Sequence, residues 1–413
     1  MRTESAPPSR RIVVTGMGVV SPWGWGLSPF LAGILSGQTA IGPFSRFDHS
    51  RQRTHVAGEV PAAPPKVRGR LKGFGRLSHA DAYALAAAQE ALDQAGLLPG
   101  APGVAGVYLG GSTGGLLESE WYYERQLKGQ DPSRRLLASQ QLSAPGDAVA
   151  RYAQTRGPIE TVSSACASGG LALEAALRDL GSGEAEWALA GGSDSLSQIT
   201  YSGFNALRAV SESPCRPFRQ DRTGMSIGEG AALLVLEPLE RALSRGAEPL
   251  AELKGAGSSC DASHMTAPHP EGLGAALAIE QALKDAGLKP EDIDFVNAHG
   301  TGTPLNDVAE WAALRRSLGE RAGRIPLTST KGVVGHLLGS SGAIEAVATI
   351  LCLRERKLHP TPGAGTVDPA APVDLVLGQP RSLPDARFGL STSLAFGGAN
   401  AAVIFGRWQG LTS

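Results

Sequence analysis

The stretch TVSSACASGG, residues 161–170, places one cysteine, Cys166, among small residues. The β-branched residues before it are typical of a strand, and GGLALEAALRDLGSG after it has helical spacing. A thiol at such an elbow lies near a helix N-terminus, where backbone N–H groups stabilise a thiolate and lower its pKa. The pattern indicates a nucleophile, although a buried free cysteine is also a common core residue.

Two histidines occupy similar settings further along the chain. His299 follows the apolar segment IDFV, His336 precedes a helical pattern, and each has a glycine beside it. Each histidine therefore lies at the end of a strand or the start of a helix, and this is the edge of an open α/β sheet where ligands bind. Either histidine alone could be a hydrogen-bonded structural residue. Their occurrence together with an elbow cysteine favours one site that contains Cys166, His299 and His336.

The elements that must position these groups alternate between strand and helix. Residues 11–22 read as a buried strand. Residues 79–97 read as a helix, with alanines at helical spacing and Gly96 as its stop. The alternation continues through the chain and predicts an α/β fold with a largely parallel sheet.

An internal similarity divides the chain into two parts. Residues 90–111 resemble 281–300, and residues 167–177 resemble 339–349 more weakly. The separations are similar, which predicts two related halves, 10–250 and 251–410. Chance similarity between amphipathic units is the alternative. In this division the cysteine belongs to the first half and both histidines to the second.

Composition restricts the function classes. The 413 residues carry a net charge of -1, so no bulk charge favours nucleic acid or an anionic membrane. Four cysteines without a CxxC pair argue against disulfides or zinc and favour reduced thiols in the cytoplasm. We expect a disordered leader at 1–9, no signal peptide, and no membrane span, because the apolar runs are too short.

The motifs as a set resemble the elongating β-ketoacyl-acyl-carrier-protein synthases over residues 10–407. The resemblance is carried by RIVVTGMGVVSP, SSACASGG, RPFRQDRTGMSIGEGAALLVLEP, NAHGTGTPLND, STKGVVGHLLGSSGAIE and SLAFGGANAAVIF, in this order. It implies a thiolase-like fold of two similar halves in five layers, αβαβα, usually as a homodimer. It also implies an acyltransferase that performs decarboxylative Claisen condensation without metal or organic cofactor.

The resemblance assigns roles to residues of this chain. Cys166 would carry the acyl chain, and His299 and His336 would hold the oxyanion of the decarboxylating malonyl thioester. Backbone N–H groups of Cys166 and Phe396 would hold the oxyanion of the acyl carbonyl. The remaining assignments are an ion pair of Lys331 and Glu345 that orients His336, the pantetheine-binding hydroxyls of Thr301 and Thr303, and the loop residues Leu394 and Ala395.

The implied partner is an acidic acyl carrier protein, loaded with acyl or malonyl groups, which a basic patch should receive. The segment 66–76 contains basic residues and no acid. A matching segment docks the carrier in the family, although a solvated loop is the ordinary alternative. The basic residues are Lys66, Arg68, Arg70, Lys72 and Arg76.

Two regions depart from the family pattern. The C-terminal loop has Ala395 where elongating enzymes commonly have a hinge glycine before the phenylalanine, and Leu394 is its bulky gate residue. If this position requires a positive φ, alanine costs roughly 1 kcal/mol. Similar loops occur in specialised polyene or polyketide synthases, so acyl length and pathway stay open. Residues 116–145, with Trp121, Tyr122 and Tyr123, line either the acyl pocket or a subunit interface.

Alternative functions make distinct demands on the sequence. Chain-length-factor partners lack the cysteine, but a catalytic subunit paired with such a partner keeps it. Thiolases use a second cysteine in a C-terminal CxG motif, and initiating synthases pair cysteine with one histidine and an asparagine. A nucleotide-binding or scaffold protein is the remote alternative, but neither GMGVVS nor LGGSTGG reads GxGxxG.

Overall fold

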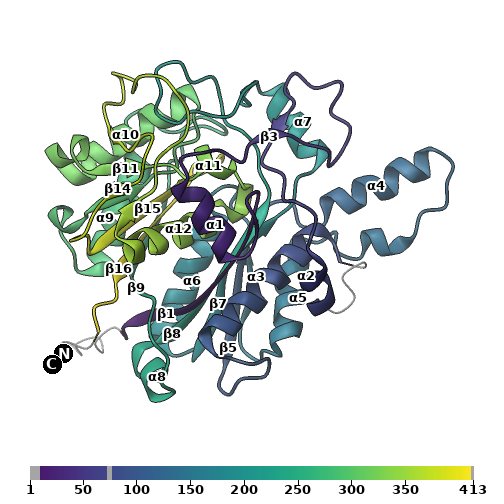
Figure 1. Cartoon of the computed structure of the whole chain (residues 1–413), viewed down its shortest axis with the longest axis horizontal. Helices are drawn as coiled ribbons and strands as arrows, with labels where there is room; N and C mark the ends of the chain where they lie inside the picture. The colour runs from purple at the N-terminus through teal and green to yellow at the C-terminus, as the bar shows by residue number, and fades with distance from the viewer. Residues whose placement is uncertain (1–9, 72–76, 411–413) are drawn as a thin grey trace.

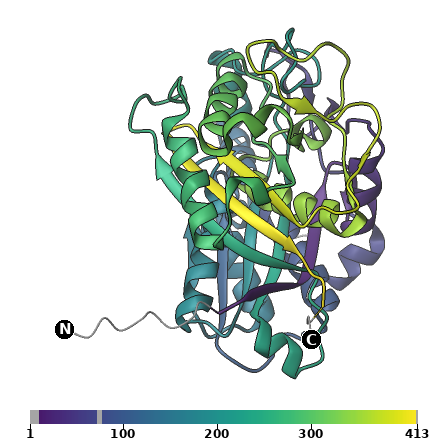
Figure 2. The same ribbon diagram turned by 90° about the vertical axis from the view of Figure 1, so that its left-hand side faces the viewer.

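The computed structural model describes residues 10–71 and 77–410, which form one large sheet with helices on both faces (Figures 1 and 2). The strand order is β13-β11-β10-β15-β16-β9-β1-β8-β7-β5-β6, with β2 paired to β1. The strands are β1 Ile12–Ser21, β2 Gly24–Trp25, β5 Ala105–Gly110, β6 Ile159–Val162, β7 Trp187–Asp194, β8 Gly230–Pro238, β9 Ala251–Cys260, β10 Phe295–Asn297, β11 Pro326–Thr328, β13 Asp374–Leu375, β15 Phe388–Leu394 and β16 Ala399–Arg407. Two small sheets pair β3 Gly42–Pro43 with β4 Val56–Ala57, and β12 Lys357–Leu358 with β14 Arg381–Ser382.

The helices cover both faces of this sheet. They are α1 Leu27–Leu35, α2 Pro65–Arg70, α3 His79–Ala95, α4 Leu116–Leu127, α5 Ala144–Ala153, α6 Ser168–Ser182, α7 Gln198–Ala206, α8 Leu239–Ser244, α9 Leu273–Ala286, α10 Pro304–Leu318, α11 Lys331–Val334 and α12 Ser341–Glu355. Helix α4 projects from the body as an arm (Figure 1). No helix within 10–71 and 77–410 is long and apolar enough to cross a bilayer.

The local elements follow the sequence pattern closely. The predicted strand at 11–22 is β1, which is buried along its whole length. The predicted helix at 79–97 is α3, which opens with a capping box between Ser78 and Asp81 and ends at Gly96 in the left-handed conformation. These local predictions are confirmed because periodicity and caps act within a few residues.

The expectation of a largely parallel sheet is wrong, because the sheet is mixed. Parallel pairs lie at its two flanks, such as β5 with β6 and β7, and β10 with β11 and β15. The long central strands β8, β1, β9 and β16 pair antiparallel. The pairing pattern is similar on the two sides of the β1–β9 contact. The division into halves at residues 250 and 251 remains a prediction.

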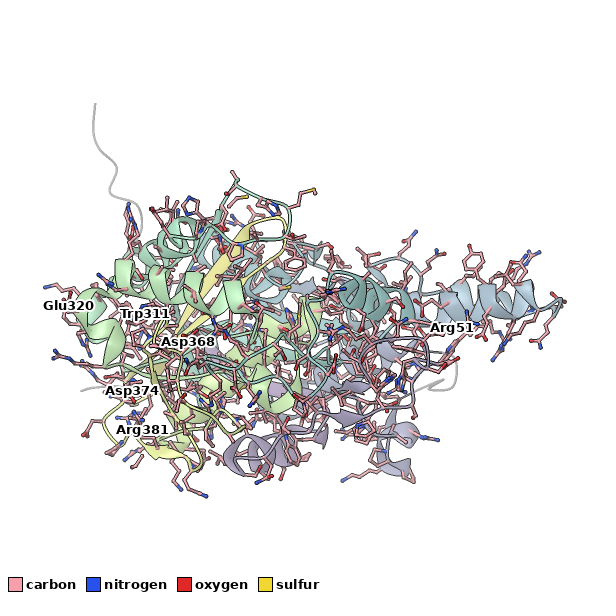
Figure 3. All side chains as sticks on the ribbon, turned by 90° about the horizontal axis from the view of Figure 1, so that it is seen from above. Arg51, Trp311, Glu320, Asp368, Asp374 and Arg381 are labelled. Carbon is pink, nitrogen blue, oxygen red and sulfur yellow. The ribbon has the colours of Figure 1, made fainter. Side chains whose placement is uncertain are left out.

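Charged groups of both signs surround the molecule, in agreement with its small net charge. Figure 3 shows such side chains along the rim, including Asp374 and Arg381. These two form an ion pair, with 2.5 Å between Arg381 Nη1 and Asp374 Oδ2. A cluster of buried apolar side chains extends from β1 through α6 to α12.

Helices α6 and α12 lie against each other in the middle of the structure, and their backbones touch. A Cβ atom on Gly342 of α12 would lie 2.6 Å from the backbone nitrogen of Gly170 of α6. A Cβ on Gly169 would lie 2.7 Å from the nitrogen of Ala343. Glycine is required here by close approach, because any side chain would force the helices apart. Helix α6 begins just after Cys166 and α12 shortly after His336, so this contact sets the distance between them.

We predict that Gly342→Ala destabilises the fold by about 1–3 kcal/mol, because the added methyl overpacks this crossing. Gly181→Ala is the matched control, since Gly181 lies in α6 with nothing within 4 Å of its Cβ position. It should stabilise by up to about 1 kcal/mol through helix propensity. Denaturant unfolding measures both, and equal effects of the two substitutions would contradict the close contact.

Candidate active site

Cys166 lies at a strained turn between β6 and α6. The residue before it, Ala165, has a φ of 47°, a left-handed conformation that is uncommon for a residue with a side chain. Ser168 stabilises the turn, because its hydroxyl accepts from Ser164 N at 2.8 Å and donates to the Ala165 carbonyl at 2.6 Å. We call residues 164–168 the nucleophile elbow. The elbow buries the thiol and leaves it 7% exposed.

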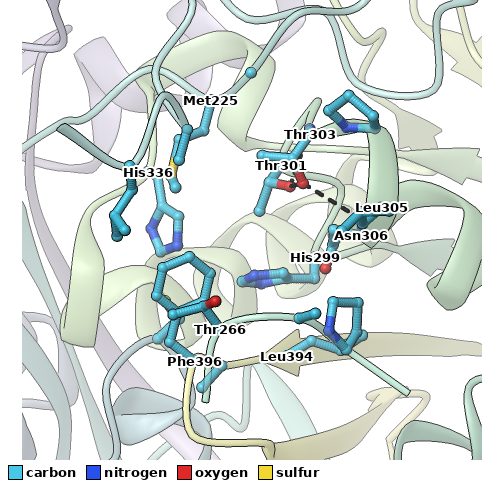
Figure 4. A pocket seen from close by; sticks show the side chains of 18 of the residues that line it. Met225, Thr266, His299, Thr301, Thr303, Leu305, Asn306, His336, Leu394 and Phe396 are labelled. Carbon is cyan, nitrogen blue, oxygen red and sulfur yellow. Dashed lines mark hydrogen bonds between the residues drawn. The ribbon is translucent and has the colours of Figure 1, made fainter. Parts of the chain in front are cut away.

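The structure brings together the three residues that the sequence predicts as one site. Single ligand atoms of Cys166, His299 and His336 all lie within 4.8 Å of one another, and all three residues are buried. The two imidazole rings meet edge to face, with centroids 5.4 Å apart. Figure 4 shows both rings pointing into the same cavity, beside Phe396. One thioester could therefore contact all three groups.

The backbone N–H of each histidine donates a hydrogen bond that fixes its position. His299 follows β10, and its N–H donates to Glu310 Oε1 at 2.7 Å. His336 follows α11, and its N–H donates to the Ser226 carbonyl at 2.7 Å. The buried carboxylate of Glu310 also accepts from Gly300 N and Thr392 Oγ1. Glu310 was not among the residues predicted from the sequence, although a glutamate between apolar residues of a helical segment is a signal for a buried carboxylate.

The hydrogen bonds at Nδ1 assign the same tautomer to both imidazoles. His336 Nδ1 lies 3.1 Å from the backbone N–H of Leu338 and 2.9 Å from Ser341 Oγ. His299 Nδ1 lies 2.9 Å from Lys331 Nζ. A backbone N–H and an ammonium can only donate, so both Nδ1 atoms accept and both protons lie on Nε2. The cavity is therefore lined by two Nε2–H donors.

Both imidazoles are neutral in this environment. Burial, followed by the positive charge of Lys331, holds the pKa of His299 and of His336 well below the usual value. Two neutral N–H donors can stabilise a developing oxyanion without a net charge in the resting cavity.

The sequence predicts a lowered pKa for Cys166, and this prediction is wrong in direction. Burial raises the pKa of the thiol to about 11, and Lys331 and the backbone N–H of Phe396 offset it only in part. The thiol does lie near the N-terminus of α6, as the sequence predicts. The pKa-raising effect of removing the thiol from water is larger than the pKa-lowering effect of the helix N-terminus. The thiol is therefore protonated at neutral pH.

Lys331 and Glu345 form the predicted ion pair, and both side chains are 1% exposed. The expectation that the pair orients His336 is wrong. Lys331 Nζ contacts His299 instead, while Leu338 and Ser341 hold His336. Burial raises the pKa of Glu345 to about 7, although Lys331 lowers it. The pair is thus a buried support of His299.

We call the cluster of Cys166, His299 and His336 the catalytic cage. These three residues help to line a cavity with a volume of about 340 Å³. Besides the cage, predicted residues that line it are Thr301, Thr303, Leu394, Ala395 and Phe396. The hydroxyls of Thr301 and Thr303 lie 2.9 Å apart. Phe204 and Arg208 also line the cavity, although the sequence pattern did not single them out; the rings of Phe204 and Phe396 are in contact, with centroids 5.7 Å apart. Residue type is the only signal for them in the sequence.

The loop that carries Phe396 adopts positive φ angles after the phenylalanine, not before it. Gly397 and Gly398 have φ angles of 86° and 84°, whereas the φ of Ala395 is not positive. The expected penalty at Ala395 therefore does not arise in this conformation. Gly397 N donates to the Met265 carbonyl, and Asp261 N donates to the Gly398 carbonyl, at 2.8 Å each.

The arm and the basic segment lie apart from the lining of the cavity. On α4, Trp121 contacts His79 with ring centroids 5.6 Å apart, while Tyr123 is 52% exposed. Tyr122 contacts Tyr123 edge to face. Among the described residues that line the cavity, none comes from α4, and the choice between an acyl-pocket and an interface role for its aromatic residues stays open.

The described part of the basic segment forms α2. Its side chains are Lys66, Arg68, which donates to the Ala63 carbonyl, and Arg70, which pairs with Asp93. Lys72 and Arg76 lie outside the described residues. The docking role of this segment stays a prediction.

A cysteine and two histidines at this spacing also have the donor set of a zinc site. Histidines that bind metal through one nitrogen normally donate a hydrogen bond from the other. Here the second nitrogen of each ring accepts a hydrogen bond, so coordination through Nε2 would require the opposite tautomer. The residues present do not fit a metal.

Comparisons with known proteins identify the class. The family model "Beta-ketoacyl synthase, N-terminal domain" matches residues 9–242, and "Beta-ketoacyl synthase, C-terminal domain" matches residues 250–364. The chain is 39% identical to a 3-oxoacyl-[acyl-carrier-protein] synthase 2 of Synechocystis, over 97% of this chain and 99% of the relative.

Solved structures agree with this assignment. The ishigamide ketosynthase/chain length factor has a TM-score of 0.91 at 35% identity, covering 97% of this chain and 100% of the other. The complex AntDE:AntF, a type II polyketide acyl carrier protein with its ketosynthase, has a TM-score of 0.88 at 30% identity with the same coverage.

The chain belongs to the β-ketoacyl synthase family and has its thiolase-like fold. Its relatives place it among the elongating ketosynthases, which are acyltransferases. This excludes a nucleotide-binding or scaffold protein.

We predict that alkylation of Cys166 by iodoacetamide accelerates steadily with pH from 7 to 10. The thiolate is the nucleophile, and its fraction rises tenfold per pH unit below a pKa of about 11. Mass spectrometry of the Cys166 peptide at timed intervals measures the rate, with the exposed Cys260 as internal comparison. A plateau below pH 8 would show a lowered pKa and contradict the effect of burial.

We also predict that Lys331→Met destabilises the enzyme by about 3–5 kcal/mol, because it leaves the Glu345 carboxylate buried without its cation. Adding Glu345→Gln should recover part of this loss, since the second change removes the unpaired charge. Denaturant unfolding of both variants provides the measurement. Additive losses in the double variant would mean that the two charges are not coupled.

Proposed function

We propose that this protein extends an acyl chain by two carbons through decarboxylative Claisen condensation, with Cys166 as the acyl carrier and malonyl on an acyl carrier protein as the extender. The observation that carries the proposal is the convergence of one thiol and two Nε2–H donors in a single buried cage. Fatty acid or polyketide chains are the substrate class.

The first step transfers the acyl group to Cys166. The sulfur attacks the thioester carbonyl of the acyl carrier protein, the bond from carbonyl carbon to pantetheine sulfur breaks, and the thiol proton ends on the departing sulfur. The backbone N–H of Phe396 already faces the Cys166 sulfur. Together with the N–H of Cys166, it is placed to hold the oxyanion of this step.

The second step removes CO₂ from malonyl bound to its carrier. The bond from the α-carbon to the carboxylate breaks, and its electron pair moves to the thioester as an enolate. The Nε2–H groups of His299 and His336 donate to the enolate oxygen. Their exclusion from water makes these hydrogen bonds stronger than they would be in solvent.

The third step forms the carbon–carbon bond. The enolate carbon attacks the acyl carbonyl on Cys166, and the bond from that carbonyl carbon to sulfur then breaks. The Cys166 thiolate takes up one proton, which restores the resting thiol. The product is a β-ketoacyl chain on the carrier protein. These three reaction steps need neither a metal nor an organic cofactor.

The cavity supports a pantetheine arm as the route to the cage. Thr301 and Thr303 present hydroxyls to it, and amide groups of pantetheine are suitable partners. We propose that the carrier protein binds near this opening and that the basic residues of segment 66–76 contribute to docking. We also propose a cytoplasmic location, supported by four free cysteines in the described structure.

The assembly has two candidate forms. A homodimer is the simplest, with the arm α4 and the edge strand β6 as exposed elements. A heterodimer with a chain-length-factor-like subunit is favoured by a similar ketosynthase solved with its chain length factor. Mass photometry and a condensation assay of the chain expressed alone distinguish the two forms. A stable, active dimer supports the homodimer, and an inactive monomer supports the heterodimer.

We predict that Cys166→Ala abolishes acyl loading but retains CO₂ release from malonyl-carrier protein, because the two Nε2–H donors remain. His299→Ala or His336→Ala should slow CO₂ release on the order of 10²–10³-fold, the usual effect of removing one oxyanion donor. Intact mass of the enzyme measures loading, and trapping of labelled CO₂ measures decarboxylation. A histidine variant with full malonyl turnover would remove that residue from the mechanism.

A further inference from the structure

Asp194, the last residue of β7, is a fully buried carboxylate outside the catalytic cage. It accepts from the backbone N–H of Ser112 at 2.9 Å and of Thr113 at 2.7 Å, and from the Thr113 hydroxyl at 2.8 Å. It also accepts from Gly339 N at 2.7 Å. All these partners are neutral, so among the residues that the structure describes the Asp194 carboxylate is held by oriented dipoles and not by an ion pair.

One group of these hydrogen bonds leads to the nucleophile. Ser112 lies just after β5, and its hydroxyl donates to the Ala165 carbonyl at 3.3 Å. That carbonyl belongs to the strained residue directly before Cys166. By fixing the backbone of Ser112, the Asp194 carboxylate supports the nucleophile elbow at the same carbonyl that accepts from the Ser168 hydroxyl.

The other hydrogen bond leads to the second histidine. Gly339 follows Leu338, a residue with a left-handed φ of 53°, and the N–H of Leu338 donates to His336 Nδ1. This donor keeps the His336 proton on Nε2. A Cβ on Gly339 would lie only 2.8 Å from Asp194 Oδ2, so carboxylate and turn are in direct contact.

We propose that Asp194 is a positioning residue that fixes the nucleophile elbow at Cys166 relative to the turn that follows His336. Its carboxylate spans the two regions matched by separate family models, since Ser112 and Asp194 lie in the first and Gly339 in the second. Four donors converge on its two carboxylate oxygens, and an apolar or amide side chain cannot accept from all of them. The inference deepens the proposed function, on which it rests.

Asp194→Asn tests this role, because the amide keeps the shape but replaces one acceptor oxygen with a donor. We expect acyl loading of Cys166 and malonyl decarboxylation each to fall by roughly one to two orders of magnitude. The KM for malonyl-carrier protein should stay within a factor of about 2, because Asp194 does not line the cavity. The probes are a carrier protein with a medium-length acyl chain and malonyl-carrier protein, with rates expressed per folded enzyme.

Glu237→Gln is the matched control, since Glu237 is also a fully buried carboxylate but contacts Thr15, Arg241 and Arg245. It should lose stability and keep both partial reactions at the wild-type rate. If it slows both reactions as much as Asp194→Asn, the effect is general destabilisation and the proposal is overturned. Wild-type rates for both reactions in folded Asp194→Asn would also overturn it.

Ser112→Ala keeps the test decisive even if Asp194→Asn does not fold. It removes only the hydroxyl that reaches the elbow, so acyl loading should slow at least fivefold while decarboxylation stays unchanged. Equal rates for both reactions in Ser112→Ala and the wild type would overturn the connection to Cys166. A wild-type enzyme that neither loads acyl groups nor releases CO₂ would instead refute the proposed function itself.

Discussion

The structure depends on one constraint: two buried helices must approach until their backbones touch. Helix α6 begins just after Cys166 and α12 follows His336, so the separation of these helices sets the separation of sulfur and imidazole. Glycines at 169 and 342 remove the side chains that would hold the helices apart. Close packing then makes the distance between the reactive groups a property of the core rather than of mobile loops.

Burial determines the electrostatics of the cage. It keeps the thiol protonated and both imidazoles neutral, so the resting site has one charged pair, Lys331 and Glu345, directly behind His299. Stabilisation of negative charge is left to oriented N–H groups. These dipoles are already in place when an oxyanion forms, so little reorganisation is required.

The sequence predicts those parts of the fold that depend on near neighbours. The strand at β1, the helix at α3 and the elbow at Cys166 follow from periodicity, caps and small residues. The convergence of Cys166 with His299 and His336 is also predictable, because ligand-binding residues gather at one edge of such sheets.

Other features depend on contacts between distant segments, so local patterns do not contain them. The contact of Lys331 with His299 rather than His336 depends on how α11 lies against the end of β10. The tautomer of His336 depends on a backbone N–H, which every residue but proline has. The direction of the Cys166 pKa shift depends on the depth of burial, and residue type alone does not give that depth.

The most direct test of the account is a single turnover with acyl-loaded enzyme and malonyl-carrier protein labelled with ¹³C in the carboxylate. We predict equal amounts of labelled CO₂ and of carrier-bound β-ketoacyl chain two carbons longer, with Cys166 returned to the free thiol. Release of CO₂ without the longer chain, or a longer chain that retains the label, would contradict a shared cage for sulfur and enolate.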